Sequence, residues 1–379
     1  MPNEPPRAPP FALVVLATSM AFVVGQLDVT IVNVALPAMA RALDAGVAGL
    51  QWVVDAYAVA FAAFMLSAGA IAIALGPVLG GLLVASVGWP AIFWVNAPLC
   101  AVGLWLVRRL RETPTGRDRP PLDVAGQLLA TLLLAALIAT LIESRALGLV
   151  DPRVVAGGVA TIALALALAA VERRAAAPVI ASDLFALRDF RNAVLFGMAV
   201  NATYYGAIFV IALFLQGARR YTPMQAGFAF LPLTAGFFLS NVASGRVIGR
   251  LGTRKPMIAG ALVDLAGFGV LAWASTTDSL AALLAGFLLI PCGMGLAVPA
   301  MTTTVLSTVD SGRSSLAAAI LNTARQAAGA IGVAAFGALA HGGADQVGSG
   351  LRIACVVSMI LLGGAAIAAA RSSGVPPHE

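Results

Sequence analysis

The feature that most limits the fold is a run of 52 residues without a charged side chain, between Asp55 and Arg108. A helix needs about 20 apolar residues to cross the hydrocarbon core of a bilayer. Of the whole chain, 60% is hydrophobic and only 11% is charged, whereas soluble proteins carry about 25% charged residues. The sequence therefore predicts an all-α integral membrane protein.

The apolar runs favour helices over the strands of a membrane barrel. They are far longer than the alternating segments of about 10 residues that form such barrels, and a helix satisfies its own backbone in lipid. The first run follows a short polar segment, MPNEPPRAPP, and is too long for a signal-peptide core, which predicts an uncleaved first span. The later spans are predicted at 124–142, 154–171, 192–216, 224–244, 256–274, 280–302, 316–340 and 351–370.

The basic residues predict the orientation. With the N-terminus inside and alternating spans, 17 of the 23 Lys and Arg residues, Arg325 among them, lie on inner segments. Cytoplasmic loops of membrane proteins are rich in Lys and Arg. The sequence therefore predicts a multi-pass protein of the plasma membrane with both termini in the cytoplasm. The net charge of +6 follows from these loops, and no nucleic-acid partner is expected.

The same orientation constrains the uncharged run. Asp55 lies near the outer face and Arg108 at the inner face, so the chain between them crosses an odd number of times. Three crossings counted from Gln51 to Val107 leave 19 residues for each, near the minimum for a span. One turn is predicted at 88–90, and another must fall within 70–77, although that stretch has no charge. About 12 transmembrane helices result.

Two carboxylates lie within predicted spans. Asp28, with Thr30 and Asn33 nearby, lies in the outer half of the first span. A carboxylate in hydrocarbon costs about 2.5 to 3.5 kcal/mol, so it marks a functional site or pairs with another group. Proximity to the interface is the alternative for Asp28. Asp264 lies in the span 256–274, either as a contact for protons or substrate or as a satisfied packing partner.

Two glycine-rich stretches are further candidates. The sequence GPVLGG at 76–81 combines a helix-breaking proline with small residues, which permits a kink and close helix packing; ordinary small-residue packing is the alternative. A basic stretch at 245–255 is either a gating loop or a positively charged inner flank. The candidate residues of the two stretches are Gly76, Pro77, Gly80, Gly81, Gly245, Arg246, Gly249, Arg250 and Arg254.

The sequence contains no motif of an enzyme or of an ATP-driven pump. It has no HExxH, Walker loop, nucleophile elbow or cluster of metal ligands. The three cysteines are isolated in apolar runs, which is typical of small buried residues. We therefore expect no enzymatic activity, no metal and no cofactor.

Several motifs in order resemble the major facilitator superfamily, and specifically its fourteen-span drug:proton antiporter branch of the EmrB/QacA type. They include LDVTIVNVALP, QWVVDAYAVAFA, LGPVLGGLLVASVGWPAIFWVNAP, PLDVAGQLLATLLLA, YTPMQAGFAFLP, GRVIGRLGTRKP and LNTARQAAGAIGVAAFG. In that branch a basic inner loop and spans three and four follow the second span. Here Ala70 leads directly into 71–81, which implies that this loop and these two spans are absent.

The resemblance implies a domain order and further site residues. The implied regions are a cytoplasmic tail at 1–10, a truncated N-terminal bundle at 11–107, a linker with two extra helices at 108–191, a six-helix bundle at 192–371 and a tail at 372–379. Gln51 and Tyr57 match the second span of the branch. Arg325 and Gln326 resemble a pair at the inner end of its thirteenth span, with snorkelling to the interface as the alternative.

The resemblance also implies a function. We expect proton-coupled export of small amphipathic, drug-like molecules across the lipid bilayer, by alternating access of two bundles and with the proton gradient as energy source. Asp28 would bind the proton, while Thr30, Asn33 and Asp264 would line the path. The alternative is an inactive deletion variant of such a transporter, retained for membrane binding or assembly. The sequence specifies neither the substrate nor the oligomeric state.

Overall fold

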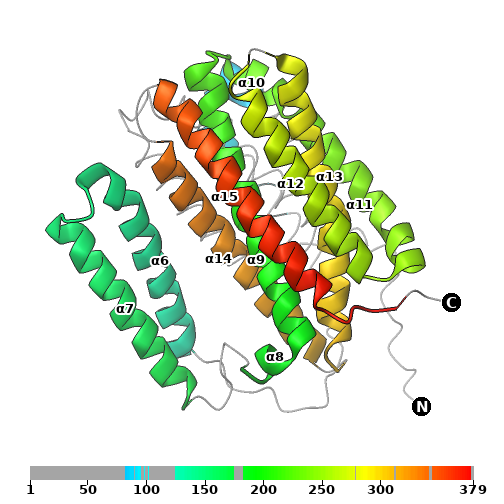
Figure 1. Cartoon of the computed structure of the whole chain (residues 1–379). Helices are drawn as coiled ribbons and strands as arrows, with labels where there is room; N and C mark the ends of the chain where they lie inside the picture. Colours follow the sequence, from blue (N-terminus) through cyan, green and yellow to red (C-terminus); the bar gives the residue numbers. More distant parts are fainter. Residues whose placement is uncertain are drawn as a thin grey trace, which may run out of the picture.

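The structure, a computed structural model, describes residues 82–88, 90–94, 98, 101, 124–174, 182–277, 279–310, 313–340 and 344–376. Regular secondary structure in these residues is entirely helical, which confirms the all-α prediction (Figure 1). The helices are α4 (Ala91–Trp94), α6 (Val124–Leu147), α7 (Pro152–Glu172), α8 (Ser182–Ala186), α9 (Arg188–Leu213), α10 (Pro223–Ala229), α11 (Leu231–Leu251), α12 (Arg254–Ala274), α13 (Leu280–Ser307), α14 (Ser314–Leu339) and α15 (Ala344–Ala370).

Each span predicted after residue 123 corresponds to one helix, except that 224–244 corresponds to α10 and α11 together. In the described part of the chain, six helices are long and apolar enough to cross a membrane, or seven with a pair bent by 41° near Ala243. Helix α9 continues into a π-helical turn, Phe214–Ala218. The chain is therefore a multi-pass membrane protein.

Local sequence signals set several helix ends. Asp151 caps α7 by accepting a hydrogen bond from the Arg153 amide, with a proline at the first helical position. A capping box formed by Thr222 and Gln225 starts α10. Gly252 ends α11 at φ +72°, a conformation that favours glycine. Gly88 has φ +100° in a turn where the sequence predicted one.

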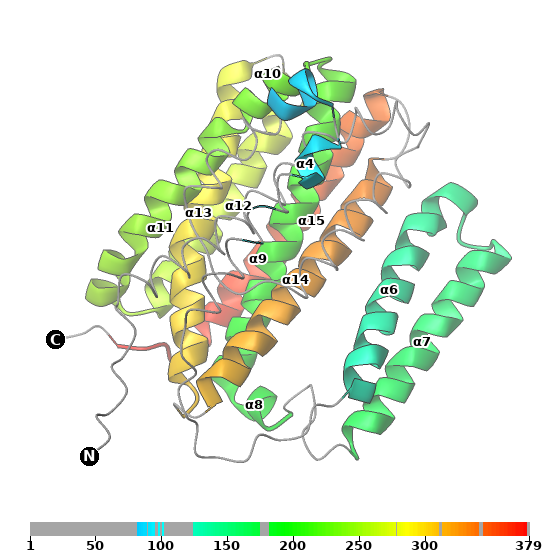
Figure 2. The ribbon, with the colours of Figure 1, turned by 180° about the vertical axis from the view of Figure 1, so that it is seen from behind.

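Helix α9 lies at the centre of the described bundle. It packs against α13, α14 and α15, while α12 lies between α13 and α15 and α11 covers the far side of α13 (Figures 1 and 2). Helices α6 and α7 form a separate hairpin that meets the bundle where α6 packs on α14. Ile138 and Ile142 contact Ala330 and Ala334 there. This arrangement agrees with a helix pair distinct from a C-terminal bundle, although the exact domain boundaries remain a prediction.

The segment after α15 folds back onto the bundle instead of leaving it. Thr253, in the turn between α11 and α12, donates its amide to the Val375 carbonyl at 3.1 Å, and its hydroxyl accepts from the Val375 amide at 2.9 Å. The Arg254 guanidinium donates to the Ala370 carbonyl, and the Ser373 amide donates to Asp189 of α9 at 2.9 Å. Residues 371–376 thus join the ends of α9, α12 and α15.

Replacing Thr253 with valine tests this attachment. The change keeps the side-chain shape but leaves the Val375 amide without its acceptor and removes the contact with the Thr304 hydroxyl at 2.9 Å. We expect a loss of about 1 to 2 kcal/mol in unfolding free energy, seen as a lower unfolding midpoint in detergent. Thr276→Val is the control, because among the described residues that exposed hydroxyl bonds only to the Trp273 carbonyl in its own turn. Equal midpoints for the two variants would contradict the attachment.

Candidate functional site

Asp264 lies in the buried stripe of α12. The buried positions of this helix recur every three or four residues, as expected for the inner face of a helix: Met257, Gly260, Ala261, Asp264, Gly267, Phe268, Leu271 and Ala274. The side chain is 1% exposed, and neither carboxyl oxygen has a hydrogen-bond partner among the described residues. An acidic group therefore occupies a core position without the partner that buried polar groups normally have.

Close contact between α12 and α13 surrounds this carboxyl group. A Cβ atom built on Gly293 of α13 would lie 2.8 Å from the Asp264 Cβ, and one on Gly260 would lie 2.7 Å from the Ala297 Cβ. Only glycine allows the two helices to approach so closely. A negative charge between them would cost several kcal/mol without a partner. Gain or loss of a proton at Asp264 therefore changes the energy of this helix contact.

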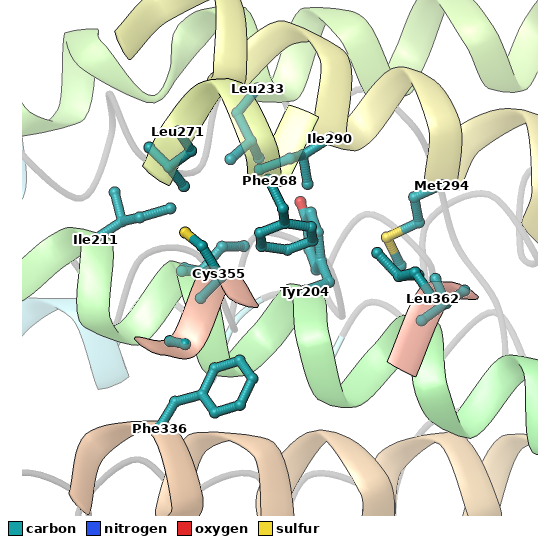
Figure 3. Packing of buried hydrophobic residues seen from close by; sticks show 14 of the residues in the cluster. Tyr204, Ile211, Leu233, Phe268, Leu271, Ile290, Met294, Phe336, Cys355 and Leu362 are labelled. Atoms are coloured by element: carbon teal, nitrogen blue, oxygen red, sulfur yellow. The ribbon is translucent and has the colours of Figure 1, made fainter. Parts of the chain in front are cut away.

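Helix α9 closes the other side of the site. Tyr204 of α9 is buried and extends toward Phe268 and Ile290 (Figure 3). Phe268 lies one turn after Asp264 on the same face of α12. The rings of Tyr204 and Tyr205 meet edge to face, with centroids 5.3 Å apart. The aromatic side chains of Phe268, Tyr204 and Tyr205 therefore extend from the neighbourhood of Asp264 on α12 to α9.

Arg325 and Asn201 form a polar contact between α14 and α9. The Arg325 Nε donates to the Asn201 Oδ1 at 3.0 Å, and Asn201 is 1% exposed. The stem of the arginine crosses Gly197, where a Cβ would lie 3.1 Å from its Cγ. The bundle thus contains a buried acid on one side of α9 and a partly buried base on the other.

Arg325 and Gln326 lie within helix α14. The resemblance placed Arg325 and Gln326 at the inner end of a span. Both lie near the middle of α14 (Ser314–Leu339), and both are partly buried. The arginine hydrogen-bonds to Asn201 near the middle of α9. Its assignment to an inner segment stays a prediction. The span was predicted from an apolar run that contains this charge, and sequence alone does not show which face carries it.

The basic stretch 245–255 lies at the junction of α11 and α12. Arg246 and Arg250 are exposed, and so is Gly245. Apart from the chain neighbours and the backbone of α11 itself, no described atom lies within 4 Å of a Cβ built on Gly245 or Gly249. Close packing among the described residues therefore does not require glycine at these two positions. Their gating role stays a prediction.

The remaining predicted site residues lie outside the described part of the chain. They are Asp28, Thr30, Asn33, Gln51, Tyr57, Gly76, Pro77, Gly80 and Gly81. The candidate site that can be built from the structure therefore consists of Asp264, Tyr204, Tyr205, Asn201 and Arg325. Within the described residues, no three His, Cys, Asp or Glu side chains gather as metal ligands would.

Sequence reasoning missed three of these five residues. Asn201, Tyr204 and Tyr205 interrupt the apolar run 192–216 with polar groups. Polar side chains within a span are rare and tend to face the bundle interior. That signal was present, but it does not reveal that Asn201 faces Arg325, which is 124 residues away in the sequence.

Comparisons with known proteins agree on one family. The family model described as "Major Facilitator Superfamily" matches residues 63–333. The methylenomycin A resistance protein of Streptomyces coelicolor is 28% identical over 94% of this chain and 92% of its own length. From Mycobacterium tuberculosis, the multidrug resistance protein Stp is 27% identical over 86% of this chain and 75% of its own length, and the drug efflux pump JefA is 26% identical over 92% and 86%.

The alignments are longer than the chain itself. The one with the Streptomyces protein covers 442 residues, whereas this chain has 379. At least 63 aligned positions of that relative therefore have no counterpart here. Such a difference exceeds the length of two membrane-spanning helices of about 20 residues each.

Proposed function

This chain belongs to the major facilitator superfamily, and we propose that it is a proton-coupled exporter of small amphipathic, drug-like molecules. Its relatives carry names of antibiotic resistance and drug efflux proteins, and the similarity extends over most of their length. We further propose that it lies in the plasma membrane with both termini in the cytoplasm, as the distribution of basic residues predicts. The sequence contains no enzyme motif that would favour a catalytic function instead.

The observation that carries the proton coupling is the unpartnered carboxyl group of Asp264. It lies between α12 and α13, where glycines bring the helices together and no described residue bonds to it. Ionisable groups inside membrane bundles characteristically form proton relays or substrate paths. We propose that proton uptake and release at Asp264 shift the packing of α12 against α13, while Asp28 is the proton-binding candidate of the first span.

Substrate would then pass through the polar interior of the bundle. In proteins that work by alternating access, the substrate site lies near the bilayer midplane between the two halves. Arg325 and Asn201 lie near the middle of α14 and of α9, which suits such a site. Thr30, Asn33, Gln51 and Tyr57 remain the candidates for the other half.

A transport assay with purified protein tests the function. The chain is reconstituted in proteoliposomes, and uptake of ethidium is followed while a pH gradient is imposed. Coupled export predicts that the gradient drives accumulation and that a protonophore abolishes it. Substrate panels extended with puromycin and other antibiotics then define the specificity. Correctly inserted protein that moves no compound of the panel, with or without a gradient, would contradict the proposal.

The alternative is a chain that no longer transports because two spans are absent. The length of the alignments supports it, since at least 63 positions of a relative are missing here. A helix bundle that lost two members exposes faces that were buried and would be expected to associate with another helix. The proteoliposome assay distinguishes the two functions. Protein that binds a substrate but does not transport it into the vesicles would favour the inactive variant.

A further inference from the structure

Exposed basic side chains gather at the end of the bundle where α9 and α12 begin and where α11 and α15 end (Figure 1). They form the basic end surface, which consists of Arg188, Arg191, Arg250, Arg254, Lys255 and Arg371. Residues 370–375 hold α9 and α12 against the end of α15 there, through hydrogen bonds with Asp189, Thr253 and Arg254. Six positive charges therefore lie on one surface built from four helices.

No described carboxylate forms an ion pair with these six side chains. The described ion pair at this end of the bundle joins Asp183 of α8 to Arg313 instead. Asp189 lies between Arg188 and Arg191 in the sequence, but its Oδ1 accepts a hydrogen bond from the Ser373 amide at 2.9 Å. Because like charges repel one another, the surface as described suits an anionic partner.

The end of the chain positions two of the basic groups side by side. The Arg254 guanidinium donates to the Ala370 carbonyl, which brings it beside Arg371. Gly374, at φ +70°, packs so closely on the stem of Arg254 that a Cβ would lie 2.8 Å from the Arg254 Cβ. An arginine has five N–H donors, and this is the only described bond of the Arg254 side chain. Most of its donors are therefore available to another acceptor.

An exposed apolar side chain accompanies three of the basic residues on the same helix face, further into the span. The pairs are Lys255 and Leu262 on α12, Arg191 and Leu195 on α9, and Arg371 and Ile367 on α15. The three apolar side chains are between 49% and 56% exposed. A soluble anion would contact only the charges. A phospholipid brings a phosphate diester to the charges and acyl chains to the apolar side chains beside them.

We propose that the basic end surface binds anionic phospholipid, with Arg254, Lys255 and Arg371 around the phosphate diester and the acyl chains along the adjacent helix faces. Clusters of Lys and Arg at a membrane surface attract anionic lipids. An arginine can also bind two phosphate oxygens through two parallel N–H donors. The proposal goes beyond the proposed export function and does not depend on it, because the surface can bind lipid whether or not the bundle transports a substrate.

A titration with short-chain lipids tests the proposal. Purified protein in detergent is titrated with dioctanoyl phosphatidylglycerol, with dioctanoyl phosphatidylcholine and with inorganic phosphate, and the unfolding midpoint is recorded. A ligand that binds only the folded protein raises this midpoint. Wild type should bind phosphatidylglycerol about tenfold or more tightly than phosphatidylcholine, and added salt should weaken this preference. Inorganic phosphate at the same concentration should leave the midpoint unchanged.

Removal of single charges locates the binding. Lys255→Gln and Arg371→Gln change side chains that form no hydrogen bond with a described residue, so both variants should unfold as wild type does without lipid. Each should bind phosphatidylglycerol about fivefold more weakly and phosphatidylcholine as wild type does. Arg153→Gln is the matched control, because this exposed arginine lies at the start of α7, outside the basic end surface. It should keep the wild-type preference.

Three results would overturn the proposal. Equal affinity of wild type for the two lipids would show that the surface does not select an anionic headgroup. Wild-type affinity in both Lys255→Gln and Arg371→Gln would place any lipid preference elsewhere on the protein. A rise of the midpoint with inorganic phosphate as large as with phosphatidylglycerol would show that the ligand is a soluble anion.

Discussion

Asp264→Asn is expected to abolish transport driven by a pH gradient while leaving the protein folded. Asparagine has nearly the same shape as aspartic acid but cannot exchange a proton at this position. Because the carboxyl group has no hydrogen-bond partner among the described residues, its replacement breaks no bond. We expect gradient-driven ethidium accumulation to fall by about tenfold or more, as for loss of an ionisable group on a proton path, with little change in the unfolding midpoint.

Proteoliposomes with a pH-sensitive dye inside measure both proton and substrate movement. Asp151→Asn is the matched control, because it makes the same chemical change at the N-cap of α7, where asparagine caps as well as aspartate. The control should transport as wild type does. Wild-type proton-coupled flux in Asp264→Asn would show that Asp264 is a packing residue, the alternative left open by its sequence, and would leave Asp28 as the proton-binding candidate.

The positions of the helices could be predicted from the sequence, because each follows from a local property. Apolar runs bounded by charges, prolines and glycines predicted a span at 256–274, and the structure has α12 at Arg254–Ala274. Asp264 was also found this way, since a carboxylate in an apolar run stands out without any knowledge of the fold. The ends of α15 and α11 were predicted less well, because helices continue into polar segments when caps and tertiary contacts permit.

The contacts between helices could not be predicted in the same way. Thr253 and Val375 are joined through a backbone bond that no side-chain pattern encodes, so the end of the chain was expected to be a simple tail. The pairing of Asn201 with Arg325 depends on the rotation of two helices about their axes. Weak amphipathicity makes that rotation hard to infer for a membrane helix, because lipid and core are both apolar.

The second large effect is expected at the contact of α9 with α14. A Cβ built on Gly332 would lie 2.8 Å from the Cα and from the carbonyl carbon of Ala202, and one on Gly206 would lie 2.9 Å from the carbonyl carbon of Gly332. The two backbones therefore touch without intervening side chains, as small residues allow in membrane bundles. A leucine at 332 cannot be accommodated by a rotamer change, since the obstacle is backbone.

Gly332→Leu should force α9 and α14 apart and destabilise the protein by about 3 kcal/mol or more, at the upper end for overpacking of a close contact. We expect a large loss of monodisperse protein on size-exclusion chromatography and a lower unfolding midpoint. Gly364→Leu makes the same change on an exposed position of α15, where no described residue of another helix lies within 4 Å of the added Cβ, and should behave as wild type. Similar midpoints for both variants would contradict the α9–α14 contact.

The smaller change Gly332→Ala connects this packing to the site. Ala202 follows Asn201 directly, and Gly332 lies two turns after Arg325 on the same side of α14. A single methyl group at 332 should widen the helix contact and lengthen the hydrogen bond from Arg325 to Asn201 at 3.0 Å. If Arg325 is positioned by that bond on the substrate path, Gly332→Ala should lower gradient-driven ethidium accumulation in proteoliposomes. Unchanged accumulation in a folded Gly332→Ala protein would show that this packing does not affect the site.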